Sequence, residues 1–139
     1  MPVSTLLDLD RWRPPDSGSI VAAGVDLVDT ERLELAFSRS GPGLARRLFG
    51  DRAEELTADP AAAAGAFGVQ ESVVKLAGGL PKGGRLSDIL LDKQGGAVTL
   101  SGVLADWAHR HGAVVVGGYL PLTPGLTVSW ALALTGGAR

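Results

Sequence analysis

Cysteine is absent from this 139-residue sequence, and histidine occurs only twice. Without cysteine the chain forms no disulfide bond and offers no thiolate ligand to a metal ion. The lack of cysteine also agrees with a cytoplasmic location, which is the location we expect. Hydrophobic residues make up 45% of the chain, so the sequence supplies enough apolar surface for a core and is not expected to be disordered as a whole.

Long apolar runs and an excess of basic residues are also missing. No uninterrupted apolar stretch approaches the roughly 20 residues that a membrane-spanning helix needs. The first 19 residues, MPVSTLLDLDRWRPPDSGS, contain Asp8 and Asp10 and do not show the pattern of a signal peptide. The formal net charge of −2 excludes a generally basic nucleic-acid binder. We therefore expect neither a membrane nor a nucleic acid as a partner.

The length is that of one compact domain. Residues 1–19 contain two consecutive prolines, Pro14 and Pro15, and are interpreted as a flexible N-terminal extension. The folded domain is expected over residues 20–135. Apolar periodicity predicts strands and helices in alternation along this part. The predicted strands are 20–28, 86–92, 97–100, 113–120 and 126–134, and KQGG at 93–96 is predicted as a hairpin turn. A first helix is predicted to begin at Asp29 or Thr30. Further helices are predicted at 44–48, 59–77 and 103–110.

The long helix carries an acid and a base beside its apolar face. At about 100° per residue, Glu71 lies about 40° from Phe67, and Lys75 lies about 40° beyond Glu71. Gly68 and Ser72 complete this side with small residues, so open space is expected beside Glu71. One interpretation is an exposed pair of opposite charges one helical turn apart, which contributes only a few tenths of a kcal/mol. The other is a functional site.

Asp26 interrupts the apolar run of the first predicted strand. Residues two apart in a strand share a face, so Asp26 stands with Ala22, Gly24 and Val28. An ionised carboxylate near a core must be paired or bind a cation, because burying it alone costs several kcal/mol. The small neighbours leave room for such a cation. The alternative is that Asp26 lies past the end of the strand and caps the next helix.

Two motifs together resemble the holo-acyl-carrier-protein synthases, the small phosphopantetheinyl transferases. The family pattern G-[IV]-D-[ILV]-x-x-x-x-R-[ILF] is matched by GVDLVDTERL, residues 24–33. Its helix pattern F-x-x-K-E-[AS]-x-x-K-x-x-G is matched by FGVQESVVKLAG, residues 67–78, except at one position. The resemblance covers about residues 20–135. It implies an α+β fold in which a mostly antiparallel sheet packs against a long central helix.

The resemblance also implies a reaction and a set of residue roles. Such enzymes transfer 4′-phosphopantetheine from coenzyme A to a serine of an apo acyl carrier protein, in fatty-acid or polyketide biosynthesis. By similarity, Asp26 and Glu71 hold Mg²⁺, Lys75 and Gly78 contact coenzyme A, and Glu71 and Lys75 are catalytic. Mg²⁺ suits one or two carboxylates combined with phosphate oxygens and water. Relatives are commonly trimers, so a homotrimer is expected.

Arginines gather in the helix that follows Asp26. Arg32 and Arg39 lie seven residues apart and so share a helix face, and Arg46 and Arg47 come soon after. In the family, arginines at the places of Arg32 and Arg39 contribute to docking of the acidic carrier protein, and a basic face suits this. The alternative is that these arginines only keep the helix soluble.

Three departures from the family pattern argue for a second hypothesis. Gln70 stands in place of a lysine, Ala66 stands in place of an arginine, and the late strand lacks the family's histidine. His109 and His111 lie upstream of that strand and are interpreted as helix-end residues near terminal carbonyls. Fewer cations should weaken coenzyme A binding. The alternative function is therefore a relative that binds carrier protein or acyl-thioester intermediates in a biosynthetic complex without transferring anything.

Overall fold

The computed structural model describes residues 19–92 and 96–135. The predicted flexible extension, apart from Ser19, and the predicted KQGG turn, apart from Gly96, lie outside the described residues. The start of the predicted domain at residue 20 is therefore close to the first described residue, and the division into an extension and a domain stays a prediction. In the part described, no helix is long and apolar enough to cross a membrane.

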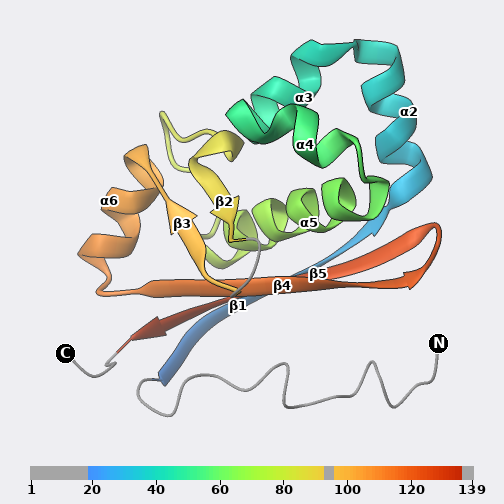
Figure 1. Cartoon of the computed structure of the whole chain (residues 1–139). Coiled ribbons are helices and arrows are strands. Elements are labelled where there is room, and N and C mark those ends of the chain that lie inside the picture. Colours follow the sequence, from blue (N-terminus) through green and yellow to red (C-terminus); the bar gives the residue numbers. More distant parts are fainter. Residues whose placement is uncertain (1–18, 93–95, 136–139) are drawn as a thin grey trace.

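The main sheet has three antiparallel strands in the order β1-β5-β4, and a smaller sheet pairs β2 with β3. All the helices lie on one side of the main sheet (Figure 1). This is the α+β arrangement that the resemblance implied, with a mostly antiparallel sheet against a long helix. The strands are β1 Ser19–Asp29, β2 Ile89–Leu91, β3 Val98–Leu100, β4 Val114–Thr123 and β5 Leu126–Thr135; the helices are α2 Thr30–Ser40, α3 Pro42–Phe49, α4 Ala53–Thr57, α5 Pro60–Leu76 and α6 Gly102–Arg110.

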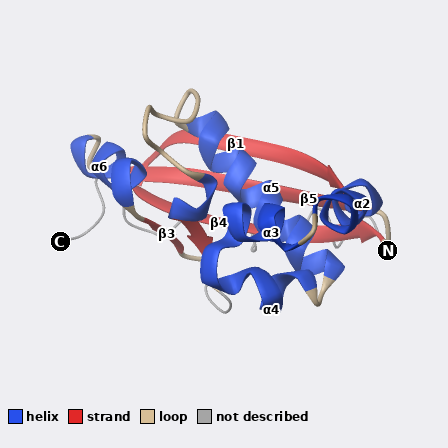
Figure 2. Cartoon of the chain, turned by 90° about the horizontal axis from the view of Figure 1, so that it is seen from above, coloured by secondary structure: helices blue, strands red, loops and turns tan. Residues whose placement is uncertain are grey.

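The central helix α5 forms nearly where the sequence predicted it. Its N-cap is Asp59, whose side chain accepts hydrogen bonds from the backbone amides of Ala61 and Ala62, and Pro60 occupies the first turn. The helix ends at Leu76, and Gly78 and Gly79 follow with positive φ angles of 79° and 125°. Seen from above, α5 runs over the sheet, and α3 and α4 lie on the side of α5 away from the sheet (Figure 1 and Figure 2).

Glycine allows α5 to approach the sheet unusually closely. A Cβ added at Gly24 of β1 would overlap the carbonyl oxygen of Ser72, and one added at Gly68 would overlap the side chain of Ser129. Gly68 and Ser72 are buried against the sheet, so the prediction that they leave open space beside Glu71 is wrong. The room at Gly24 is likewise filled by the α5 backbone. These glycines fix the distance between β1 and α5.

Two hydrophobic clusters lie on either side of α5. The first joins α5 to the helices α2, α3 and α4 and has buried Phe49 and Leu48 at its centre. The second joins α5 to both sheets and to α6, through residues such as Val69, Val73 and Leu104. Because α5 contributes to both clusters, it is held firmly, and side chains at the margin between the clusters keep fixed positions.

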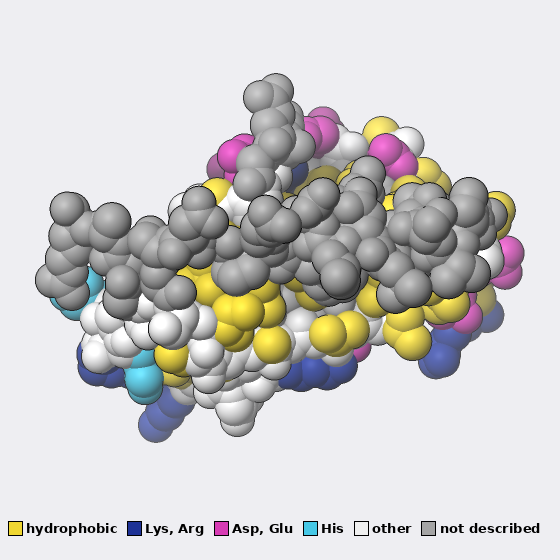
Figure 3. Space-filling view, turned by 90° about the horizontal axis from the view of Figure 1, so that it is seen from below, with side chains coloured by type: hydrophobic (Ala, Val, Ile, Leu, Met, Phe, Trp, Pro, Cys, Tyr) yellow, Lys and Arg dark blue, Asp and Glu magenta, His cyan; other side chains and the backbone are white. Residues whose placement is uncertain are grey.

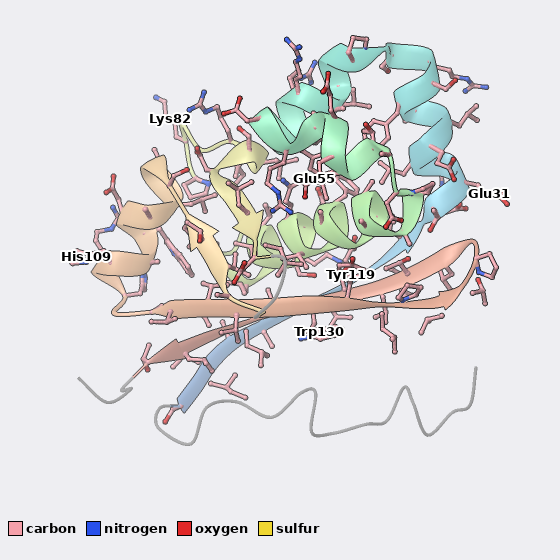
Figure 4. All side chains as sticks on the ribbon, viewed as in Figure 1. Glu31, Glu55, Lys82, His109, Tyr119 and Trp130 are labelled. Atoms are coloured by element: carbon pink, nitrogen blue, oxygen red, sulfur yellow. The ribbon has the colours of Figure 1, made fainter. Side chains whose placement is uncertain are left out.

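The other face of the main sheet carries apolar side chains, and none of the helices in the described ranges covers it. Val25 of β1 pairs with Trp130 of β5, which pairs with Gly118 of β4, and the indole ring lies against Gly118. Figure 4 shows Trp130 on this side of the sheet and Tyr119 on the helix side. Val25 and Leu27 are 52% and 60% exposed, and Figure 3 shows hydrophobic side chains on this face between the grey atoms.

Some predicted elements differ from the structure. Residues 86–92 do not form one strand, because 86–88 make a 3₁₀ turn before β2 begins at Ile89. The piece predicted at 44–48 is the longer helix α3, and α4 was not predicted at all. Short helices carry few periodic positions, so tertiary packing against Phe49 and Leu56 decides them rather than local pattern.

Candidate functional site

The structure brings Asp26 and Lys75 into direct contact. The Nζ atom of Lys75 lies 2.7 Å from Oδ1 of Asp26 and 2.9 Å from the carbonyl oxygen of Val25. The Asp26 side chain is 19% exposed, whereas that of Lys75 is 53% exposed. Asp26 projects from the face of β1 that packs on α5, as the alternation predicted. An acid and a base 49 residues apart in sequence therefore form one ion pair between strand and helix.

The charges of Asp26 and Lys75 both affect the pKa of the Glu71 carboxyl. Burial raises the pKa of the Glu71 carboxyl, the negative charge of Asp26 raises this pKa further, and the positive charge of Lys75 lowers it. Within residues 19–92 and 96–135, the Glu71 side chain makes no hydrogen bond or ion pair. The interpretation of Glu71 and Lys75 as an isolated pair on the helix is therefore wrong, because Lys75 pairs with the strand instead.

Asp26 does not cap the following helix. Asp29 does so, and its Oδ1 accepts a hydrogen bond of 3.0 Å from the backbone amide of Arg32. The sequence had offered Asp29 or Thr30 for this role, and the structure selects Asp29. The capping interpretation of Asp26 is thereby excluded, and its carboxylate pairs with the Lys75 ammonium instead.

A pocket of about 330 Å³ opens beside this group, between β1, α2 and α5. Leu33, Ala36 and Phe67 provide apolar lining, and Asp26 and Arg32 bring charge of opposite sign to its wall. The pocket is shallow and open to solvent, Asp29 adds a second acid to its wall, and Glu71 and Lys75 do not line it. Asp26, Arg32 and Phe67 all belong to the two motifs from which the resemblance was drawn.

The donor set fits Mg²⁺ held jointly with a substrate. Among the described residues there is no cluster of three or more His, Cys, Asp or Glu side chains that would hold a metal ion by itself. Two converging carboxylates, one of them without a protein partner, suit an ion that takes its remaining ligands from phosphate oxygens and water. The site is thus too sparse for a structural metal and adequate for a metal bound to a phosphate ligand.

Gln70, one residue before Glu71, is part of the core. It is 2% exposed, and its Nε2 lies 2.6, 3.0 and 3.3 Å from the carbonyl oxygens of Leu48, Leu86 and Ile89. The side chain therefore ties α5 to α3 and to the start of β2. That this side chain faces α3 and β2 rather than β1 is a feature that the motif alone did not reveal.

Ala66 lines a second cavity, of about 150 Å³, together with Arg52 and Tyr119. The Arg52 guanidinium donates a hydrogen bond of 2.6 Å to the carbonyl oxygen of Leu91. Burial raises the pKa of the Tyr119 hydroxyl, the negative charge of Asp59 raises it further, and Arg52 lowers it. Arg52, in the 3₁₀ turn before α4, therefore places a cation near Ala66, the position where the family pattern has an arginine.

The remaining predicted residues are placed apart from the ion pair. Gly78 follows the end of α5, and no described contact joins it to Asp26. Arg39 lies in the last turn of α2, and Arg46 and Arg47 lie in the last turn of α3. These three arginines and Arg32 are exposed, and none makes an ion pair with the described part of the chain.

The interpretation of His109 and His111 as helix-end residues near terminal carbonyls is confirmed for His111. Nδ1 of His111 lies 2.8 Å from the carbonyl oxygen of Trp107 at the end of α6, as expected for a helix-end histidine. No contact of the His109 side chain decides its role. Neither histidine belongs to β4, so the late-strand histidine of the family is missing from this fold as it is from the sequence.

Comparison with known proteins gives a clear result for the fold. No family model and no curated sequence matches the chain. Among solved structures, the Plasmodium yoelii holo-acyl-carrier-protein synthase is similar with a TM-score of 0.69 and 20% identity, over 86% of this chain and 98% of that one.

Two bacterial structures agree. The Neisseria meningitidis holo-[acyl-carrier-protein] synthase has a TM-score of 0.71 and 18% identity over 83% of this chain and 98% of its own. The Helicobacter pylori enzyme, solved in complex with coenzyme A, has a TM-score of 0.67 and 20% identity over 80% and 98%. Each of these chains is matched over nearly its whole length, so this protein has the fold of the holo-acyl-carrier-protein synthases.

Proposed function

We propose that the protein is a divergent phosphopantetheinyl transferase, which moves 4′-phosphopantetheine from coenzyme A to a serine of an apo acyl carrier protein in a Mg²⁺-dependent reaction. The observation that carries this proposal is the convergence of Asp26, Glu71 and Lys75 beside a pocket lined by Arg32 and Phe67. The similar fold of a synthase solved with coenzyme A supports it.

Each charged group has a distinct part in this reaction. Asp26 and Glu71 would hold the ion together with the diphosphate of coenzyme A, and the bound ion would neutralise charge on the attacked phosphorus and on the leaving group. Lys75 contributes a mobile ammonium for phosphate oxygens. The serine hydroxyl of the carrier displaces adenosine 3′,5′-bisphosphate, so one phosphodiester bond forms as the diphosphate bond breaks and the serine proton is released.

The partner surface proposed for the carrier protein includes Arg32 and Arg39 on α2. Both side chains are exposed, and no described acid neutralises either of them. An acidic carrier that docks there would bring its serine toward the pocket beside Arg32. Charge complementarity of this kind raises the rate of encounter and is weakened by salt.

A homotrimer in the cytoplasm is part of the same proposal. The apolar outer face of the β1-β5-β4 sheet, which includes the exposed Val25 and Leu27, is a suitable contact between copies because no helix of the described residues covers it. Val25→Asp should convert the trimer into a monomer that is still folded, as measured by analytical ultracentrifugation and circular dichroism. A wild-type protein that sediments as a monomer would refute the trimer.

The alternative is a relative that binds carrier protein or acyl thioesters without transfer. Ala66 and the missing late-strand histidine favour it, because both remove positive charge or a hydrogen-bond donor from the family pattern. Gln70 also favours it, because it replaces a lysine of the family pattern with a neutral side chain whose amide lies in the core.

A mass-spectrometric assay decides between the two functions. The protein is incubated with coenzyme A, Mg²⁺ and a panel of apo carrier proteins, and a transferase adds the mass of one phosphopantetheine to a carrier. Asp26→Asn should abolish this addition, whereas Asp106→Asn on the exposed surface of α6 removes the same charge and should not. Carrier binding without any mass change over the whole panel would instead support the non-transferring relative.

A further inference from the structure

The Lys75 ammonium is held in a defined position against Asp26 by two hydrogen-bond acceptors. Its ammonium has two acceptors on β1, Oδ1 of Asp26 at 2.7 Å and the carbonyl oxygen of Val25 at 2.9 Å. A second acceptor fixes the direction from which the ammonium approaches the carboxylate. The exposed lysine side chain is thus anchored across the gap between α5 and β1, although 53% of its surface remains in contact with solvent.

Lys75 pairs with only one of the two carboxylates, that of Asp26. Glu71 stands one helical turn before Lys75 on α5 and makes no hydrogen bond or ion pair with the described residues, so its carboxylate and that of Asp26 both lie on the Lys75 side of the helix and repel each other. A divalent cation placed between Asp26 and Glu71 would relieve that repulsion. It would also lie beside the Lys75 ammonium, which repels it and already occupies one oxygen of Asp26.

A diphosphate ligand removes this conflict. Its oxygens offer the ammonium new acceptors, and the four-carbon stem of lysine lets Nζ move away from Asp26 without a change in the backbone. The same oxygens supply the ligands that two carboxylates leave unfilled on Mg²⁺. The ammonium and the metal ion then share the negative charge of the diphosphate instead of competing for Asp26.

We propose that Lys75 excludes a free divalent cation from Asp26 and Glu71, so that the site accepts the metal only together with a diphosphate-bearing ligand. This inference rests on the proposed function, because coenzyme A is the diphosphate in question. Lys75 is then a specificity-determining residue as well as a phosphate contact. Metal and diphosphate bind with positive coupling, and the coupling acts equally in both directions.

The first test measures binding of Mn²⁺ alone, by the electron paramagnetic resonance signal of the free ion. Lys75→Met should bind Mn²⁺ about tenfold more tightly than the wild type, because the competing charge is gone. Lys75→Arg should keep the exclusion. Lys82→Met is the matched control, since Lys82 is an exposed lysine in the loop after α5 and its loss should leave Mn²⁺ affinity unchanged.

Two further measurements connect the effect to this site. Adding Asp26→Asn to Lys75→Met should remove the gain in Mn²⁺ affinity. By calorimetry, Mg²⁺ should tighten coenzyme A binding more in the wild type than in Lys75→Met, because only the wild type has to release Asp26. Circular dichroism of each variant confirms that the fold is retained.

Failure of this inference is distinguishable from failure of the proposed function. Equal or weaker Mn²⁺ binding by folded Lys75→Met would overturn the exclusion by Lys75, even if the wild type modifies a carrier protein. A wild type that binds neither Mg²⁺ nor coenzyme A, alone or together, and modifies no carrier would overturn the proposed function itself.

Discussion

Gln70 and Glu71 are neighbours on α5 and yet belong to two different regions of the molecule. Gln70 points into the junction of α5, α3 and β2, where its amide lies against three carbonyl oxygens. Glu71 lies on the side that meets β1, at the margin of the core, beside Asp26 and Lys75. A rotation of about 100° along the helix separates a structural polar residue from a candidate functional one.

The two residues differ in how their polar groups are satisfied. The Gln70 amide nitrogen lies within hydrogen-bond distance of carbonyl oxygens of α3, the 86–88 turn and β2, so it links these segments to α5, while its Oε1 is buried without a partner among the described residues. The Glu71 carboxylate finds no partner in the described chain and keeps access to solvent, so a ligand can still reach it.

The largest expected effect tests the Glu71 region. Asp26→Asn should lower the rate of carrier modification at least about a hundredfold, because the metal and the diphosphate lose a charged ligand worth several kcal/mol in the transition state. The rate is measured by mass spectrometry of the carrier. The melting temperature should change little, and a large fall in melting temperature with no change in Mg²⁺ or coenzyme A binding would mean that Asp26 is structural.

The second effect tests the Gln70 region. Gln70→Met keeps the length of the side chain and removes its donors, so it should lower the free energy of unfolding by about 2 kcal/mol. Urea denaturation measures this change. Glu71→Gln is the control on the same helix and should not destabilise the protein at neutral pH. If Gln70→Met is as stable as the wild type, the three carbonyl contacts do not matter to the fold.

A smaller effect is expected on the basic surface of α2. Arg32→Glu combined with Arg39→Glu should weaken carrier binding about tenfold at low ionic strength and less at high ionic strength, because the attraction is screened. Lys82→Glu combined with Arg110→Glu makes the same change in net charge away from α2 and should have little effect. Calorimetry at two salt concentrations gives both affinities. Equal weakening by the two double variants would assign the effect to net charge alone.

The smallest effect concerns pH and the metal-free protein. The pKa of Glu71 is raised in the folded state by burial and by Asp26, so the unfolded chain releases this proton at a lower pH than the folded one. Ionised Glu71 therefore costs stability above about pH 4.5, its ordinary value, and nothing well below that value. Glu71→Gln should be slightly more stable than the wild type at pH 7 and equal to it at pH 3, as measured by thermal unfolding. A difference that persists unchanged at pH 3 would assign the effect to packing.

Local sequence signals predicted much of the fold. The capping residues Asp29 and Asp59 mark the starts of α2 and α5, because their side chains bind backbone amides within three residues. The apolar alternation predicted β1, β4 and β5 to within a few residues. The 3₁₀ turn at 86–88 and helix α4 were missed, since neither is long enough to show a period.

The candidate site was only partly predictable. The sequence named Asp26, Glu71 and Lys75, and the structure brings them together. It did not show that Lys75 pairs with Asp26 rather than with Glu71, because a contact across 49 residues has no local signal. The sequence also predicted open space beside Gly24 and Gly68, and this was wrong for the same reason. Their lack of a side chain makes room for a neighbouring element, and the sequence does not say which element fills it.

The sequence by itself determined where α2 and α5 begin, which strand positions are apolar, and which side chains can carry charge. These properties follow from interactions between residues close along the chain. Only the tertiary structure decided that Gln70 is committed to the core while Glu71 is left accessible, and that Lys75 reaches Asp26. Those outcomes depend on how closely α5 approaches β1, which is set by packing between segments far apart in sequence.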